Sequence, residues 1–342
     1  MPASHARDPL DAALLGRLGQ RAGGDQAGPR LLAGDLALLK ERGYLKIAAP
    51  VAFGGMGLTL PQVACAQRRL AYHAPAAALA VNAHHAWVGA AAGVHTGGDS
   101  STDWLLREAA QGRLFAGPRG AADDLVAAQA GLFAGSRDAA GDRLAVDPLG
   151  PASPGWDWLG VRAVDNSEPL RPRILHAFIS RPDPGCRPAR ITAPGPPEDP
   201  FIAGAFGWGL PLDGELCYAI ARRAFDQATE RARPPVTAGR DTAAAPADRD
   251  TAAAPDDGGL PAPLADAAVR LESVRDQLDA VLHGWRERAR GGGAASSLDP
   301  GGLWLIRLFT ARHVAAVGAR RVTELVAEVS GDPVGPVPRY GA

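Results

Sequence analysis

The chain has 342 residues, a formal net charge of −1 and a hydrophobic fraction of 46%, a balance that predicts a folded protein with several packed layers. The near-neutral charge provides no basic field, which excludes nucleic acids and anionic membranes as main partners. Its 42 glycines and 30 prolines exceed average usage and predict long connectors between elements.

The spacing of the cysteines and the hydropathy pattern indicate the cellular compartment in which the protein is expected. Cys65, Cys186 and Cys217 are too widely spaced for a CxxC or zinc pattern, which predicts reduced thiols. The first residues lack the apolar core of a secretory signal, and no apolar run reaches the roughly 18 residues of a membrane span. We therefore expect a cytoplasmic protein without a membrane segment.

Helical patterns fill residues 1–117, which we expect to form a first helical domain. Asp35 is expected to cap a helix that ends at Gly43, where glycine adopts the left-handed conformation at low cost. The glycine-rich run over residues 54–57 fits either a chain reversal between helices or a phosphate cradle, and the missing strand before it favours the reversal. Further helices are predicted over residues 10–20, 61–73, 75–95 and 103–111.

Residues 118–200 lose the helical period and predict a small β domain. The runs over residues 158–164 and 174–179 are expected to pair as neighbouring strands, because residues 166–169 between them have a turn composition. Short strands are also expected at residues 132–133 and 144–146.

Helical periodicity returns in residues 201–342, where three long helices predict an antiparallel bundle. The third helix is expected to bury one stripe of side chains: Ile306, Phe309, His313, Val317, Val322, Leu325 and Val329. The sequence RDTAAAP occurs twice within residues 234–259, which we interpret as a flexible linker because it has nothing with which to build a core. The three helices are predicted over residues 211–233, 264–285 and 302–329.

Two stretches of the first domain resemble a known family. LKERGYLKIAAPVAFGGMGLTLPQV and WLLREAAQGRLFAG, with an Ala-rich helix pair between them, are similar to the amino-terminal domain of the acyl-CoA dehydrogenases. The resemblance implies an α+β, mostly α fold with an N-terminal helical domain, a small central β domain and a C-terminal antiparallel helix bundle. It also implies FAD between the β domain and the bundle.

The resemblance implies the oxidation of an acyl-CoA, or a related acyl thioester, at Cα–Cβ by FAD, with a glutamate as base. Residues 149–156 are similar to the strand that lies against the flavin, so Gly150, Ser153 and Trp156 are the implied cofactor contacts. Glu215 is the glutamate nearest the start of the helix that carries the base in some members. The alternative for Glu215 is a solvated carboxylate favoured by the helix dipole.

Other features depart from the family pattern. Residues 118–121 replace a flavin-binding loop, residues 181–200 are expected to be a Pro-rich connector without a strand, and the linker replaces the Arg/Gln motif for the FAD pyrophosphate. The usual place of the catalytic glutamate lies beyond Ala342. Two hypotheses follow: a flavoenzyme, with a partner subunit supplying missing contacts, or a non-catalytic relative that acts as a structural or interaction subunit. Either is expected to form a homo- or hetero-oligomer with a related subunit.

The remaining polar residues predict no metal site. His84 and His85 are adjacent, so they lie about 100° apart on a helix and do not form the i, i+4 pair of a metal site. Packing within the bundle or lining an acyl pocket are the two roles left for them.

Overall fold

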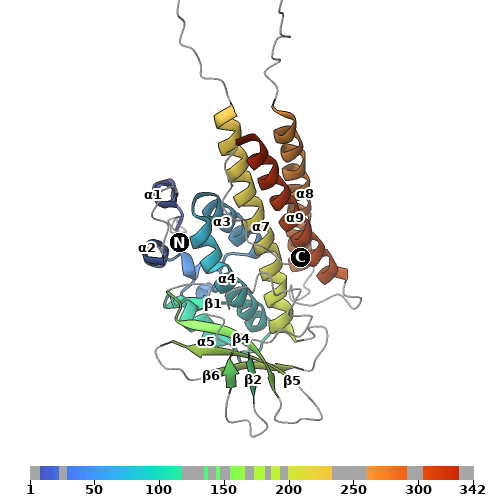
Figure 1. Cartoon of the computed structure of the whole chain (residues 1–342). Helices are drawn as coiled ribbons and strands as arrows, with labels where there is room; N and C mark the ends of the chain where they lie inside the picture. Colours follow the sequence, from blue (N-terminus) through green and yellow to red (C-terminus); the bar gives the residue numbers. More distant parts are fainter. Residues whose placement is uncertain are drawn as a thin grey trace, which may run out of the picture.

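The computed structural model describes residues 8–22, 29–117, 135–137, 144–146, 155–165, 173–181, 186–192, 199–232, 260–290 and 303–330. Within them, short helices, a sheet and three long helices follow one another along the chain (Figure 1). The sheet lies at one end, and α7 runs from it along the whole length of the helical part.

The N-terminal part is a packed group of helices joined by two 3-10 turns. Its elements are α1 (Ala12–Ala22), α2 (Pro29–Glu41), η1 (Tyr44–Lys46), η2 (Val51–Phe53), α3 (Leu60–His73), α4 (Pro75–Thr96) and α5 (Asp103–Ala110). The predicted helices are therefore present. The predicted capping role of Asp35 is wrong. Helix α2 begins at Pro29, a favourable first-turn residue, and Asp35 lies inside the helix with its carboxylate 3.2 Å from the Arg21 guanidinium.

The connector between α2 and α3 reverses the chain. Gly43 and Gly54 have φ angles of 75° and 86°, as expected of glycines that end short helical turns. The backbone amides of the glycine-rich run donate to nearby carbonyls: Gly55 to Pro50, Met56 to Lys46 and Gly57 to Ala49, at 3.2, 3.0 and 2.8 Å. Because these donors are already paired, the run is a chain reversal and offers no phosphate cradle.

Six strands form one sheet in the order β3-β2-β4-β5-β6, with β1 paired to β4 beside β2. They are β1 (Phe115–Ala116), β2 (Gly135–Arg137), β3 (Leu144–Val146), β4 (Trp158–Asp165), β5 (Arg173–Ser180) and β6 (Cys186–Thr192). The predicted pairing of β4 with β5 as neighbouring strands is confirmed, and the two strands are antiparallel. Residues 132–133 and 166–169, predicted as a strand and a turn, lie outside the described residues.

The expectation that residues 181–200 form a connector without a strand is wrong, because β6 lies within them. This strand pairs antiparallel with β5 despite Pro188, at a register shift between His176 and Ala177. An edge strand tolerates a proline because one side of its backbone makes no ladder hydrogen bonds.

The C-terminal part contains α7 (Pro200–Ala232), α8 (Ala262–Arg290) and α9 (Leu303–Ser330). The predicted start of α7 at Pro211 is wrong. The Asp199 carboxylate accepts hydrogen bonds from the backbone amides of Phe201 and Ile202, at 2.9 and 3.1 Å, so the helix begins eleven residues earlier and Pro211 lies inside it.

The predicted stripe of α9 is wrong in its first half, where Ile306, His313 and Val317 are exposed, and right in its second half, where Val322 and Leu325 are buried. The buried face also carries Ala311, Ala315 and Ala319 among larger apolar residues. Small side chains let α9 approach α7 closely, whereas the sequence pattern gave weight to the largest residues.

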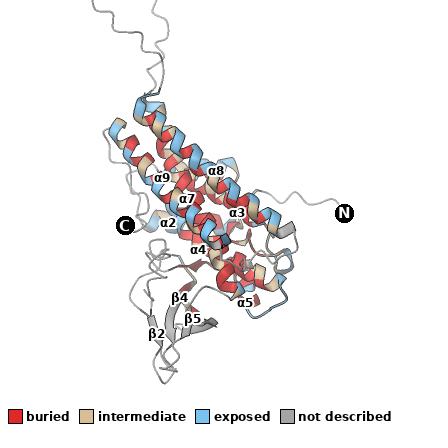
Figure 2. Cartoon of the chain, turned by 90° about the vertical axis from the view of Figure 1, so that its right-hand side faces the viewer, coloured by how far each residue is buried: buried red, intermediate tan, exposed pale blue. Residues whose placement is uncertain are grey.

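α7 is the central helix of the molecule, and Figure 2 shows buried residues along its length. It contacts α3 and α4 on one side and α8 and α9 on another. Its close approach to α4 depends on one glycine of each helix. The Trp208 ring of α7 lies on Gly89 of α4, and Ala90 of α4 lies beside Gly204 of α7. This packing fixes the N-terminal helices against the bundle.

A methyl group at Gly89 would overlap the Trp208 ring, so we expect Gly89→Ala to lower the free energy of unfolding by about 3 kcal/mol. Gly209→Ala is the matched control, because its methyl group would lie 3.6 Å from Ala86, an ordinary contact. The control should be neutral or stabilise by up to about 1 kcal/mol, since alanine is the better helix former. Urea unfolding of both variants checks this, and equal effects would contradict it.

Candidate functional site

The four predicted site residues fall in different places. Gly150 and Ser153 lie outside the described residues. Trp156 lies just before β4, and Glu215 lies in the middle of α7. The contacts of Trp156 and Glu215 involve different partners, so these two residues are described in turn.

Trp156 is half-buried at the end of the sheet, with the Arg181 guanidinium 5.9 Å from its ring centroid. The backbone there is firmly held. The Arg181 amide donates to the Asp157 carbonyl at 3.0 Å, and the Asp157 side chain accepts from the Leu114 amide at 2.8 Å and from Arg113 at 3.0 Å. An aromatic face and a cation are thus presented together at a rigid junction of α5, β1, β4 and β5.

A cluster of aromatic side chains packs between the sheet and the helices next to this junction. Trp104, Phe115, Trp158 and Phe178 have ring centroids 5.2 to 6.3 Å apart. The Trp158 indole N–H donates to Glu108 of α5 at 3.1 Å. The cluster fixes the orientation of the sheet relative to α4 and α5.

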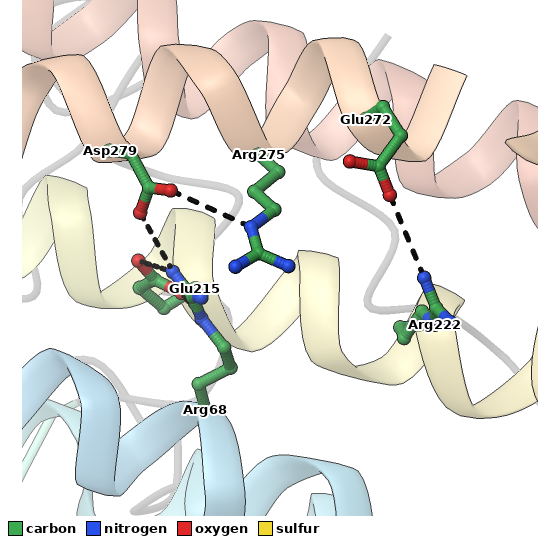
Figure 3. A network of polar contacts seen from close by, with 6 residues as sticks. All are labelled: Arg68, Glu215, Arg222, Glu272, Arg275 and Asp279. Carbon is green, nitrogen blue, oxygen red and sulfur yellow. Dashed lines mark hydrogen bonds and ion pairs between the residues drawn. The ribbon is translucent and has the colours of Figure 1, made fainter. Parts of the chain in front are cut away.

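Glu215 has an exposed fraction of 0% and forms a two-pronged ion pair with Arg68 of α3 (Figure 3). Arg68 Nε and Nη2 donate to its two carboxylate oxygens at 2.5 and 2.8 Å. The Arg68 guanidinium also lies 5.2 Å from the Tyr218 ring centroid and 3.4 Å from Asp279 of α8. The alternative of a solvated helix-start carboxylate is therefore wrong.

Burial and the ion pair act in opposite directions on the Glu215 carboxyl and on the Arg68 guanidinium. Burial raises the pKa of the Glu215 carboxyl, and the hydrogen bonds from Arg68 offset part of that rise. Arg68 has a raised pKa, because Glu215 and Asp279 outweigh its own burial. Arg275, 3.6 Å from Asp279, extends the network along α8. This geometry suits a charged link between α3, α7 and α8, and catalysis by Glu215 stays a prediction.

A second polar chain crosses the interior next to this ion pair, and the sequence analysis missed it. The Tyr44 hydroxyl donates to Gln67 Oε1 at 2.8 Å, Gln67 Nε2 to Asn82 Oδ1 at 2.8 Å, and Asn82 Nδ2 to Asp213 Oδ1 at 2.5 Å. Desolvation raises the pKa of Asp213 to about 6, although Arg312 of α9 and Asn82 oppose the rise. A detectable signal was the aspartate within the apolar run LPLDGEL.

The histidine pair packs within the helices. His84 Nε2 donates to the Leu45 carbonyl at 2.6 Å, and its Nδ1 accepts from the Phe115 amide at 3.2 Å. Burial lowers the pKa of His84 to about 4. His85 is also fully buried, with its ring edge-to-face against Tyr44. The ring nitrogens of His84 thus tie η1 to β1.

Two properties of the described residues bear on function. They contain no group of three or more His, Cys, Asp or Glu side chains placed to hold a metal ion. None of the helices in this part of the chain is both long and apolar enough to cross a bilayer.

No family model and no curated protein matches the sequence, but solved structures do. A nitrososynthase from Micromonospora carbonacea var. africana is 18% identical, with a TM-score of 0.68 over 96% of this chain and 88% of that chain. Butyryl-CoA dehydrogenase from Megasphaera elsdenii is 16% identical, with a TM-score of 0.61 over 98% and 89%. KijD3, solved in complex with FMN and a dTDP-sugar, is 17% identical, with a TM-score of 0.60 over 96% and 83%.

The chain therefore has the acyl-CoA dehydrogenase fold. The predicted fold class, mostly α with a small sheet between two helical parts, is confirmed. The domain boundaries at residues 117 and 200 stay predictions.

We expect Glu215→Gln to lower the free energy of unfolding by about 2 kcal/mol, because it leaves Arg68 with only its longer contact to the half-exposed Asp279. The loss stays below that of a fully enclosed pair because a quarter of the Arg68 side chain is exposed. Asp279→Asn, a control at the half-exposed end of the same network, should cost at most about 0.5 kcal/mol. Chemical unfolding at neutral pH measures both, and a Glu215→Gln variant as stable as the wild type would contradict the buried-pair interpretation.

Asp213 predicts a pH dependence. The pKa of Asp213 is about 6 in the folded protein against an ordinary value of 3.8, so its contribution to stability is fully present below pH 4 and is lost as the pH rises through 6. The loss corresponds to about 3 kcal/mol. Asp213→Asn removes this titration, so the difference in unfolding free energy between wild type and variant should change by that amount between pH 4 and 7. Parallel curves would contradict the assignment.

Proposed function

We propose that this chain is a flavin-dependent oxidoreductase that uses FAD to oxidise an acyl-CoA or related acyl thioester at Cα–Cβ. The observation that carries the proposal is the fold, which extends over 98% of the chain in the match to a butyryl-CoA dehydrogenase. The FMN complex of KijD3 supports a flavin as the cofactor class.

The residues at the sheet end fit a flavin. The Trp156 ring offers an apolar stacking surface of the kind that suits a flat aromatic ring system. Arg181 adds a fixed positive charge beside that surface, which would favour a reduced flavin carrying negative charge. When bound, the flavin supplies the hydride-accepting chemistry, and the chain's own residues bind and orient it and exclude water.

The alternative function is a non-catalytic relative that acts as a structural or interaction subunit. One observation favours it: the proposed base, Glu215, has both carboxylate oxygens engaged by Arg68 and no exposed surface. An acyl thioester would have to displace this pair to reach the carboxylate.

In the enzyme proposal, the protein acts in a homo- or hetero-oligomer with a related subunit.

The test is the absorbance spectrum of the purified protein after incubation with FAD or FMN and desalting. Retained flavin that bleaches on addition of an acyl-CoA supports the enzyme. Flavin retained without bleaching contradicts the acyl-CoA substrate, and no retention of either flavin supports the non-catalytic subunit.

We expect Trp156→Ala to weaken flavin retention about tenfold, because it removes the stacking surface. Trp156→Phe should retain most of the binding, since a flat ring remains. Flavin fluorescence titration of both variants measures the dissociation constants. Equal affinities in the wild type and both variants would exclude Trp156 as a flavin contact.

A further inference from the structure

Arg68 lies between two carboxylates at different depths in the protein. Its Nη2 atom is 2.8 Å from Oε1 of Glu215, which has no exposed surface, and 3.4 Å from Oδ1 of Asp279, which is half-exposed. A quarter of the Arg68 side chain is itself exposed, so the guanidinium lies at the boundary between the interior and solvent (Figure 3). One nitrogen atom therefore has an inner and an outer acceptor.

The two contacts differ in strength. Arg68 donates to Glu215 through two nitrogens, at 2.5 and 2.8 Å, whereas the contact with Asp279 uses one nitrogen and is 3.4 Å long. The structure thus shows Arg68 in an inner position, in which both oxygens of Glu215 are covered. The outer contact is long enough to tighten when the inner one is lost.

The surroundings of the guanidinium suit either position. The Tyr218 ring centroid lies 5.2 Å from Arg68 Cζ and attracts the cation in both. Arg275, the competing cation at Asp279, is 3.6 Å from that carboxylate and also shares a hydrogen bond with Tyr218. Arg275 can therefore give up Asp279 to Arg68 and keep a partner.

The charge of Glu215 decides which position is favoured. Among the described residues, the charged groups that act on its carboxyl are Arg68 of α3 and Asp279 and Arg275 of α8. Burial raises the pKa of Glu215 and Arg68 opposes the rise, so the carboxyl takes up a proton when the pair opens. A neutral Glu215 in turn accepts hydrogen bonds from a guanidinium more weakly than an ionised aspartate does. Opening and proton uptake are therefore coupled, and acid favours both.

We propose that Arg68 is a proton-controlled latch on Glu215, which covers the ionised carboxylate and moves to Asp279 when Glu215 is protonated. The proposal goes beyond the flavin chemistry and holds whether or not Glu215 is a catalytic base. Asp279 is the second acceptor of the latch, and Arg275 exchanges with Arg68 there. The open position leaves a neutral carboxylic acid, which is a hydrogen-bond donor, between α3, α7 and α8.

The NMR signal of the Arg68 Nε–H group tests the latch without any flavin, and its loss in Arg68→Lys assigns it. As the pH falls from about 8 to about 4.5, the chemical shift should approach the value in Glu215→Gln, whose side chain is neutral at every pH. The change should persist in Asp213→Asn, which removes the other buried titration on α7. A signal that stays at its alkaline position, or that titrates only while Asp213 is present, would overturn the proposal.

A second comparison tests Asp279 as the outer acceptor. Asp279→Asn should move the Arg68 signal at least about three times as far in the Glu215→Gln background as in the wild type at pH 8, because the exposed ion pair is fully formed only in the open position. Asp276→Asn, at an exposed aspartate one turn earlier on α8, is the matched control and should leave the signal unchanged in both backgrounds. Equal effects of Asp279→Asn in the two backgrounds would show that Arg68 does not move to this carboxylate.

Discussion

The close approach of α4 to α7 is the contact on which the rest of the structure depends. A helix contacted on several sides must be narrow wherever another helix crosses it, and Gly89 and Gly204 provide this where α4 meets α7. The apolar core surrounds this crossing. The sheet is attached to it through Phe178 of β5, which packs edge-to-face on Trp87 of α4, and Trp87 stacks in turn on Phe201 at the start of α7. The position of the proposed flavin surface relative to the helices therefore depends on backbone contacts that have no chemistry of their own.

Two acidic residues on one helix have separate structural partners in this crossing. Asp213 receives a directed chain of donors from Tyr44, and Glu215 receives a guanidinium from α3. Gln67 and Arg68 are sequence neighbours on α3. Gln67 donates to Asn82, which in turn donates to Asp213, whereas Arg68 donates to Glu215 directly. Polar groups buried in an interface define its register more strictly than apolar contacts do, since a shifted register leaves them unpaired.

The sequence allowed the fold to be predicted because the long periodic segments and the glycine turns act locally. Gly43 ends α2 and Thr59 with Gln62 caps α3, whatever the rest of the chain does. The buried face of α9 was predicted only in part: Val322 and Leu325 are buried, but Ala315 and Ala319 were missed because alanine carries little hydrophobic signal even where close packing requires it. The site was harder still: whether Glu215 is solvated or paired depends on Arg68, which lies 147 residues away in the chain.

The same separation affects how the protein folds during synthesis. The donors on α3 and α4 are made long before Asp213 and Glu215, with chain separations of 131 and 147 residues for the bonds they form. The buried polar contacts of α3 and α4 with α7 therefore form only after the central helix has been synthesised. The N-terminal helices complete their packing late, although they are the first part of the chain to be made.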